Sequence, residues 1–274
     1  MSLLDVKDLK TYFYTDSGVA KAVDGVTFSV DKGKVLGIVG ESGCGKSVTS
    51  LSIMRLVDPV TGKNEGGEIL FDGTDILKLP EPEMRKLRGN RISMIFQEPM
   101  TSLNPVFTIG YQIEESLILH KGMDKKAARQ QAIHLLELVG IPEAGKRVDE
   151  YPHQLSGGMR QRAALIRTLA LKPDLLLLDE PFSALDHQTR LMVCDDISSI
   201  LRKTNKTAVL VTHDLSEAIS LADRIIVLSG RPANIRQTVP LIFDLEQDTP
   251  LNRRNSPEFK HYFNLIWKEL NTDD

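Results

Sequence analysis

The sequence has little cysteine: only Cys44 and Cys194 occur among its 274 residues. Two cysteines cannot form a disulfide framework or a four-cysteine metal site, so the chain is expected in a reducing cytoplasm. No apolar run approaches the roughly 18 residues of a membrane span, and residues 1–10 lack the pattern of a signal peptide. The formal net charge of −3 gives no broad basic field for nucleic acid. These absences indicate a globular protein whose main partner is not a nucleic acid.

Hydrophobic patterning divides the chain into segments of different character. Residues 3–30 and 68–71 are expected to form short strands of an antiparallel patch, with turns at 16–18, 31–33 and 72–73. The pattern becomes helical from about residue 106 to 150. The expected strands elsewhere cover residues 34–39, 91–96, 175–178, 208–212 and 225–228, and the expected helices include 48–57 and 187–203. Because strands alternate with helices, the expected fold class is α/β, with a mainly parallel core sheet, an N-terminal antiparallel β subdomain and an α-helical subdomain inserted around residues 100–170.

One segment, residues 40–47, is a complete G-x-x-x-x-G-K-S phosphate loop. An apolar strand precedes it and a helical stretch follows, which is the context in which this loop binds phosphate. Glycines allow successive backbone N–H groups to face phosphate oxygens, and the helix adds the positive end of its dipole. The sequence therefore predicts a P-loop NTPase core that binds a nucleoside triphosphate. The residues expected at the phosphates are Gly40, Glu41, Ser42, Gly43, Cys44, Gly45, Lys46 and Ser47, with the Ser47 hydroxyl on Mg²⁺.

A second anion-binding terminus is expected at Ser156, which stands at a helix N-cap position and precedes Gly157 and Gly158. One triphosphate does not obviously need two such termini on the same protomer. The economical interpretation is that this terminus serves the nucleotide of another subunit.

Two adjacent carboxylates, Asp179 and Glu180, follow the four leucines at 175–178. Ligands of α/β folds bind at the carboxyl edge of the sheet, where these acids would lie. Two acids there would repel each other unless a cation or a proton-transfer role holds them. Asp179 fits the Mg²⁺ partner of Ser47, and Glu180 fits the general base that polarises an attacking water. His213 ends the next strand on the same edge, within reach of a γ-phosphate.

Together these motifs resemble the ATP-binding cassette (ABC) family, in particular the nucleotide-binding subunits of bacterial ABC importers, over about residues 3–230. The resemblance implies an ATPase with ATP and Mg²⁺ as cofactors. It makes residues 40–47 the Walker A motif, Asp179 the end of Walker B and Glu180 the catalytic glutamate. It further implies Gln97 as the Q-loop glutamine with a catalytic and Mg²⁺-binding role, residues 155–159 as the signature motif, residues 183–186 with Asp186 as the D-loop, and His213 as the switch histidine.

The same resemblance assigns adenine stacking to Phe13, although Tyr12 or Tyr14 could serve. Two cassettes are expected to sandwich two ATP molecules head to tail. The second ATPase subunit could be another copy of this chain or a related cassette. The helical insertion and the Q-loop should offer a groove to a short cytoplasmic helix of an integral-membrane permease. This implies a peripheral position on the cytoplasmic face of the inner membrane, with an extracytoplasmic solute-binding protein as an indirect partner and no nucleic acid.

The two halves of the chain point to different cargo classes. Residues 1–162 resemble the dipeptide, oligopeptide and nickel importers, whereas residues from 179 onward resemble the nitrate, sulfonate and taurine importers. We weight the first half more, because the Q-loop and the helical insertion face the permease. A soluble ABC ATPase that moves no cargo is the third hypothesis, although such proteins usually carry a long coiled-coil insertion or two cassettes. The expected domains are an ABC ATPase domain at 1–235 and a short extension at 236–274, which carries an amphipathic helix packed on the core.

Overall fold

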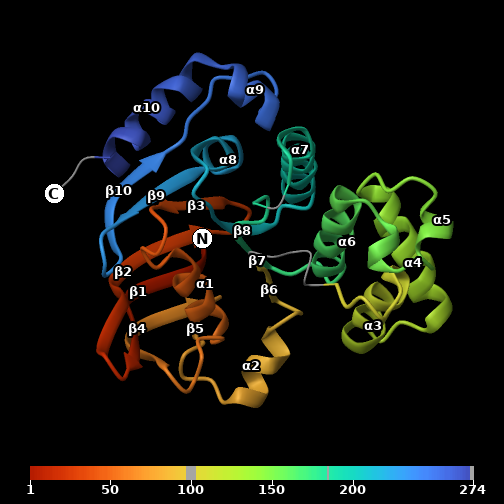
Figure 1. Ribbon diagram of the computed structural model, residues 1–274, viewed down its shortest axis with the longest axis horizontal. Helices are drawn as coiled ribbons and strands as arrows, with labels where there is room; N and C mark the ends of the chain where they lie inside the picture. The colour runs from red at the N-terminus through yellow and green to blue at the C-terminus, as the bar shows by residue number, and fades with distance from the viewer. Residues whose placement is uncertain (97–102, 184, 272–274) are drawn as a thin grey trace.

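The computed structural model describes residues 1–96, 103–183 and 185–271, which form two β-sheets with helices around them (Figure 1). The smaller sheet has the order β2-β1-β4-β5 and consists of β1 (Ser2–Thr15), β2 (Gly18–Asp31), β4 (Gly62–Phe71) and β5 (Thr74–Asp75). The larger sheet has the order β10-β9-β3-β8-β7-β6 and consists of β3 (Val35–Gly40), β6 (Ile92–Ile95), β7 (Leu175–Asp179), β8 (Thr207–Val211), β9 (Arg224–Ser229) and β10 (Asn234–Pro240). The helices are α1 (Lys46–Met54), α2 (Glu81–Leu87), α3 (Ile109–Lys121), α4 (Lys125–Leu138), α5 (Ala144–Arg147), the 3₁₀ helix η2 (Pro152–Gln154), α6 (Gly157–Leu169), α7 (His187–Lys203), α8 (Leu215–Leu221), α9 (Pro250–Asn255) and α10 (Pro257–Asn271).

The centre of the larger sheet is parallel and completely buried. Every residue of β3, β7 and β8 is buried, which explains why these strands read as continuous apolar runs rather than alternating ones. The parallel pairs are β3 with β8 and β9, and β7 with β6 and β8, whereas β10 pairs antiparallel with β9. As a result the carboxyl ends of β3, β7 and β8 lie side by side at one edge, which is where the candidate site forms.

The antiparallel N-terminal sheet is confirmed, but its expected short strands are wrong. β1 and β2 are each 14 residues long and stay paired through several register shifts. The bulges place Asp8 at φ 48° and Gly67 at φ 94°, and a Cβ at Gly67 would lie 2.5 Å from the carbonyl oxygen of Asp8. The turns expected at 16–18, 31–33 and 72–73 are present, at the ends of β1, β2 and β4. Within β1 and β2 the interrupted polar pattern marks residues looped out of long strands.

The bounds expected for two helices agree with the structure to different degrees. The helix expected at 187–203 is confirmed as α7. The helix expected at 48–57 is shifted, because α1 begins at Lys46 in the phosphate loop and ends at Met54, where Arg55 adopts φ 50°. The first turn of α1 is thus part of the loop itself.

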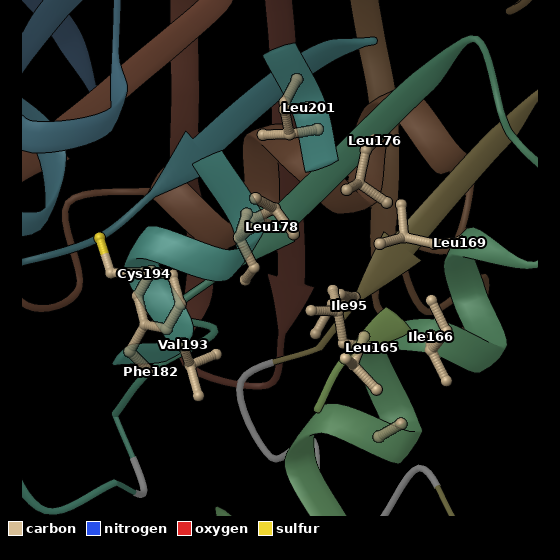
Figure 2. Close-up of a cluster of buried hydrophobic side chains, with 14 of the residues drawn as sticks. Ile95, Leu165, Ile166, Leu169, Leu176, Leu178, Phe182, Val193, Cys194 and Leu201 are labelled. Atoms are coloured by element: carbon tan, nitrogen blue, oxygen red, sulfur yellow. The ribbon is translucent and has the colours of Figure 1, made fainter. Parts of the chain in front are cut away.

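Helices α3 to α6 form a group at one end of the molecule (right in Figure 1) and correspond to the expected helical insertion. Thr108, Asp124 and Ser156 cap α3, α4 and α6 through side-chain oxygens that accept backbone N–H bonds. One apolar cluster joins these helices to the larger sheet. In Figure 2, Leu165 and Ile166 of α6 lie beside Ile95 of β6 within this cluster. The helical group is therefore packed on the core through α6.

The C-terminal residues begin as a strand and end as two helices across α8 (top of Figure 1). The amphipathic helix expected there is confirmed as α10, whereas β10 and α9 were not expected. The boundary expected between residues 235 and 236 lies within β10.

Arg253 fastens this region to the core. Its side chain is 3% exposed and donates to the carbonyl oxygen of Ala222 at the end of α8, while two of its nitrogens bond the carboxylate of Asp248. The guanidinium therefore satisfies helix-terminal carbonyls and a carboxylate at once.

Among the described residues, no helix is long and apolar enough to cross a membrane.

We expect Arg253→Met to lower the free energy of unfolding by about 2 kcal/mol, because it leaves buried carbonyl groups at the end of α8 unpaired and removes a partly buried ion pair. Urea unfolding followed by circular dichroism measures this loss. The control is Lys260→Met, which changes an exposed cation of α10. Equal stabilities of the two variants would contradict the role given to Arg253.

Candidate nucleotide-binding and catalytic site

The phosphate loop runs from the end of β3 to the start of α1 and lies directly against β2. Gly45 has φ 94°, and a Cβ there would lie 2.4 Å from the carbonyl oxygen of Ala22. Only glycine allows this approach. The pocket beside the loop has a volume of about 200 Å³ and is lined by Ala22, Ser42, Gly43, Gly45, Lys46, Ser47, Val48 and Glu180.

Lys46 lies across the loop and holds it closed. Its ammonium donates to the carbonyl oxygens of Gly40 at 2.8 Å and Glu41 at 2.7 Å, and the residue is 5% exposed. These carbonyl groups satisfy two of its three donors. The structure therefore keeps a buried positive charge at the pocket wall, where a phosphate group would be stabilised.

Ser47 and Asp179 meet at the carboxyl edge of the sheet. The Ser47 hydroxyl donates to Asp179 Oδ1 at 2.9 Å, and Asp179 is 4% exposed. Burial raises the pKa of Asp179 to about 6, against the lowering effect of the Ser47 hydrogen bond. A carboxylate that is buried as Asp179 is would be stabilised by a cation beside it. Mg²⁺ prefers oxygen ligands, and here a hydroxyl and a carboxylate would bind it together with the phosphate oxygens. The residues therefore fit Mg²⁺.

Glu180 and His213 are in contact beside Ser47 and Asp179. Glu180 Oε2 lies 3.2 Å from His213 Nδ1, and their side chains are 14% and 61% exposed. Glu180 adopts φ 46°, a left-handed conformation that costs energy for a residue with a side chain. Its backbone N–H donates to the carbonyl oxygen of Val211 at 2.8 Å, which holds this turn at the sheet edge. The strained turn directs the carboxylate toward the phosphate-loop pocket, which Glu180 also lines.

The structure places Phe13, Tyr12 and Tyr14 on β1, but on different faces. Phe13 shares a face with Thr11, whose hydroxyl lies 2.8 Å from Ser52 Oγ of α1. Tyr12 and Tyr14 point to the other face, where their hydroxyls donate to carboxylates. This arrangement favours Phe13 as the aromatic on the phosphate-loop side.

The three predicted residues of the signature motif lie away from the phosphate-loop pocket of their own chain. Ser156 caps α6 by accepting from Met159 N at 3.3 Å, and with Gly157 and Gly158 it begins that helix. None of the three lines the phosphate-loop pocket. Asp186 likewise caps α7, accepting from Thr189 N at 3.0 Å, and these hydrogen bonds lower its pKa. Gln97 lies outside the described residues.

Glu217 is a residue that the motif analysis did not single out. It is 7% exposed, and its Oε2 accepts a 2.6 Å hydrogen bond from the Thr212 hydroxyl, next to His213. Burial raises its pKa to about 7. The one available signal was its position four residues after His213, which places it on the first turn of the following helix.

Comparison with known proteins identifies the class. Residues 23–183 match the family described as "ABC transporter". The chain therefore belongs to the ABC transporter family, and it is an ATP-binding cassette ATPase.

Its more similar relatives belong to one branch of that family. It is 48% identical to the dipeptide transport ATP-binding protein DppD of Bacillus subtilis, over 85% of this chain and 70% of that protein. It is also 48% identical to the oligopeptide transport ATP-binding protein OppD of the same organism, over 88% of this chain and 67% of that protein. DppD of Escherichia coli is 46% identical, over 83% and 69% of the two chains.

Solved structures agree on the fold. A dimeric ATP-binding cassette in a post-hydrolysis state, bound to ADP and Pi, has a TM-score of 0.77 and 28% identity, and the match covers 88% of this chain and 99% of that one. The predicted α/β fold with a P-loop NTPase core and an antiparallel N-terminal subdomain is thereby confirmed. The resemblance to peptide importer ATPases is confirmed by the relatives named above.

Glu217→Gln should stabilise the nucleotide-free protein increasingly as the pH rises from 5 to 7. Below the unfolded pKa of 4.5 the carboxyl is neutral in both states. Between 4.5 and about 7 only the unfolded chain ionises, so the wild type loses stability that the glutamine variant keeps. The difference should reach about 3 kcal/mol.

Urea unfolding at pH 5, 6, 7 and 8 measures this difference. Glu137→Gln, which removes an exposed carboxylate of α4, is the control for a change in net charge. A Glu217→Gln difference that stays constant over this range would contradict the assignment.

Proposed function

We propose that this chain is the ATP-hydrolysing subunit of a bacterial importer for dipeptides, oligopeptides or a cargo of the related nickel class, acting through a separate membrane permease. The observation that carries the proposal is the 46–50% identity to dipeptide and oligopeptide transport ATP-binding proteins over more than 80% of the chain. That range includes the C-terminal half, where a nitrate or sulfonate lineage was the alternative. None of these relatives supports that alternative.

The residues at the sheet edge divide the chemistry among them. The phosphate-loop amides and Lys46 bind the β- and γ-phosphates of ATP, and Phe13 stacks on adenine. Ser47 and Asp179 would hold Mg²⁺ with Gln97, and that ion neutralises charge on the phosphates. Glu180 accepts the proton of the attacking water, and His213 hydrogen-bonds the γ-phosphate. The 3.2 Å contact between Glu180 and His213 keeps both groups at the same edge before nucleotide binds.

A second cassette completes the site. Ser156, Gly157 and Gly158 present a helix N-terminus suited to a phosphate, yet they do not line the pocket of their own chain. In a head-to-tail dimer they would contact the ATP of the other subunit, with Asp186 beside them. This supports a sandwich dimer, formed with a second copy or with a related cassette.

The permease would dock in a groove of about 500 Å³ between the end of α1, β6, α3 and α6. Its walls include the exposed side chains of Leu56, Phe96 and Leu119, which are 41%, 44% and 74% exposed. Arg167 from α6 lines the same groove. An amphipathic helix is the kind of segment that such a wall accommodates. β6 forms part of the groove and leads to Gln97, so docking and the nucleotide site would communicate along this strand. The proposal places the chain on the cytoplasmic face of the inner membrane.

Leu119→Glu should reduce recovery of the permease with the tagged chain at least tenfold while leaving ATP affinity unchanged, because it puts a charge on the apolar wall. Co-purification from detergent-solubilised membranes measures it. The control is Leu138→Glu, which alters a 56% exposed leucine of α4 outside the groove. Equal permease recovery with both variants would place the docking surface elsewhere.

Glu180→Gln should bind ATP normally, lower hydrolysis by about 100-fold or more, and accumulate as an ATP-bound dimer, because general-base catalysis is lost while the phosphate contacts remain. Lys46→Ala should weaken ATP binding itself. Phosphate release measures hydrolysis, nucleotide titration measures ATP binding by both variants, and size-exclusion chromatography detects the dimer. Turnover by Glu180→Gln at the parent rate would show that another group is the base.

The proposed function is tested by purifying tagged Glu180→Gln protein from the solubilised membranes of its own host with ATP present, and identifying co-purifying chains by mass spectrometry. Peptide-type permeases, with or without a second cassette, would support the proposal. A nitrate- or sulfonate-type permease would overturn the cargo class. Recovery without any membrane protein would favour a soluble ABC ATPase.

A further inference from the structure

Arg190 of α7 connects two loops that are far apart in the sequence. Its Nη2 donates to the carbonyl oxygen of Leu185 at 3.1 Å, and its Nη1 lies 3.2 Å from Asp214 Oδ2. Its Nε faces Glu217 Oε1 at 3.7 Å. One planar guanidinium therefore spans the loop before α7 and the loop before α8.

The loop before α8 carries His213, and both of its neighbours are fixed. Asp214 caps α8: its Oδ1 accepts the backbone N–H groups of Ser216 at 2.7 Å and Glu217 at 3.3 Å. The Asp214 N–H donates to the Thr212 hydroxyl, which in turn donates to Glu217. His213 is exposed between these two anchored residues and meets Glu180 at the sheet edge.

The loop before α7 is the D-loop of the family. Leu185 is buried, and the next residue, Asp186, is exposed and caps α7. In the proposed dimer this exposed turn faces the other subunit. Arg190 thus binds the carbonyl group of Leu185, the residue directly before Asp186, which is expected at the interface.

We infer that Arg190 is a positioning residue: it ties the backbone of the D-loop to Asp214, and so holds His213 at Glu180 in a geometry that depends on the neighbouring subunit. The inference rests on the proposed function, because it requires a second cassette at the D-loop. When the second cassette closes on the D-loop, this link would change the position of His213 in the same chain. A purely structural link between α7 and α8 is the alternative that the experiment separates from this role.

The first test is a double-mutant cycle on ATP hydrolysis by the full chain in its assembled complex. Arg190→Gln should lower kcat at least tenfold while the KM for ATP changes less than threefold, and Arg190→Lys, which lacks the planar fork, should restore only part of the activity. In a His213→Ala background, Arg190→Gln should lower kcat no further, because its effect passes through the histidine. If the losses of kcat caused by the two single substitutions multiply in the double variant, the inference is overturned. A wild-type kcat for Arg190→Gln would also overturn it.

The matched control is Arg202→Gln, on the same helix. Arg202 pairs with Asp248 at 2.7 Å, away from both loops. Its loss should leave kcat unchanged. A loss of kcat equal to that of Arg190→Gln would identify general loosening of α7 as the cause and overturn the positioning role.

A second readout does not depend on turnover. In the nucleotide-free full chain, ring signals of ¹³C-labelled histidine, assigned through His213→Ala, should shift for His213 in Arg190→Gln and not in Arg202→Gln. An unmoved His213 signal would overturn the inference. Absence of ATP hydrolysis by the wild-type complex would instead count against the proposed function, and the histidine signals would still decide the role of Arg190.

Discussion

The parallel pairing of β3, β8 and β7 is the constraint on which the rest of the structure depends. Val211 of β8 is the register partner of both Ile38 of β3 and Asp179 of β7, so three strands from distant parts of the sequence finish at the same edge of the sheet. A shift of any one strand by a single residue would turn its side chains to the opposite face of the sheet. The phosphate loop, the two carboxylates and His213 follow from this register, because they lie at the carboxyl ends of the three strands.

The helices around the sheet connect this edge to the surface of the protein. Helix α8 follows His213 and is held at both ends, by Asp214 and Arg190 at its start and by Arg253 at its finish. Helix α6 brings Ser156 to a surface that its own pocket does not use, while its apolar side packs on β6. The cassette thus has a buried sheet edge at the nucleotide site and exposed helix starts that we propose contact other chains. Such a division suits a subunit whose catalytic cycle must be transmitted to a membrane protein.

Much of the fold follows from local patterns. Central strands were predictable because burial on both faces requires continuous apolar runs, and the phosphate loop because its glycines, lysine and serine have fixed spacing. The long bulged strands β1 and β2 were not, since residues that leave the ladder break the alternation on which a strand prediction depends. Strand β10 was not expected either, because its residues are half exposed and only pairing with β9 makes them a strand.

The sequence by itself determined the chemistry of this protein: which residues can bind phosphate, hold a divalent cation and accept a proton, because those properties belong to side chains and their spacing. Tertiary structure alone decided which face of β1 packs on α1, through the 2.8 Å contact between the Thr11 hydroxyl and Ser52 Oγ. That packing puts Phe13, and not Tyr12 or Tyr14, on the side of α1. It also decided the link between Arg190 and Asp214, which are 24 positions apart. Contacts of this kind depend on how two helices pack on one sheet, and no local pattern encodes that distance.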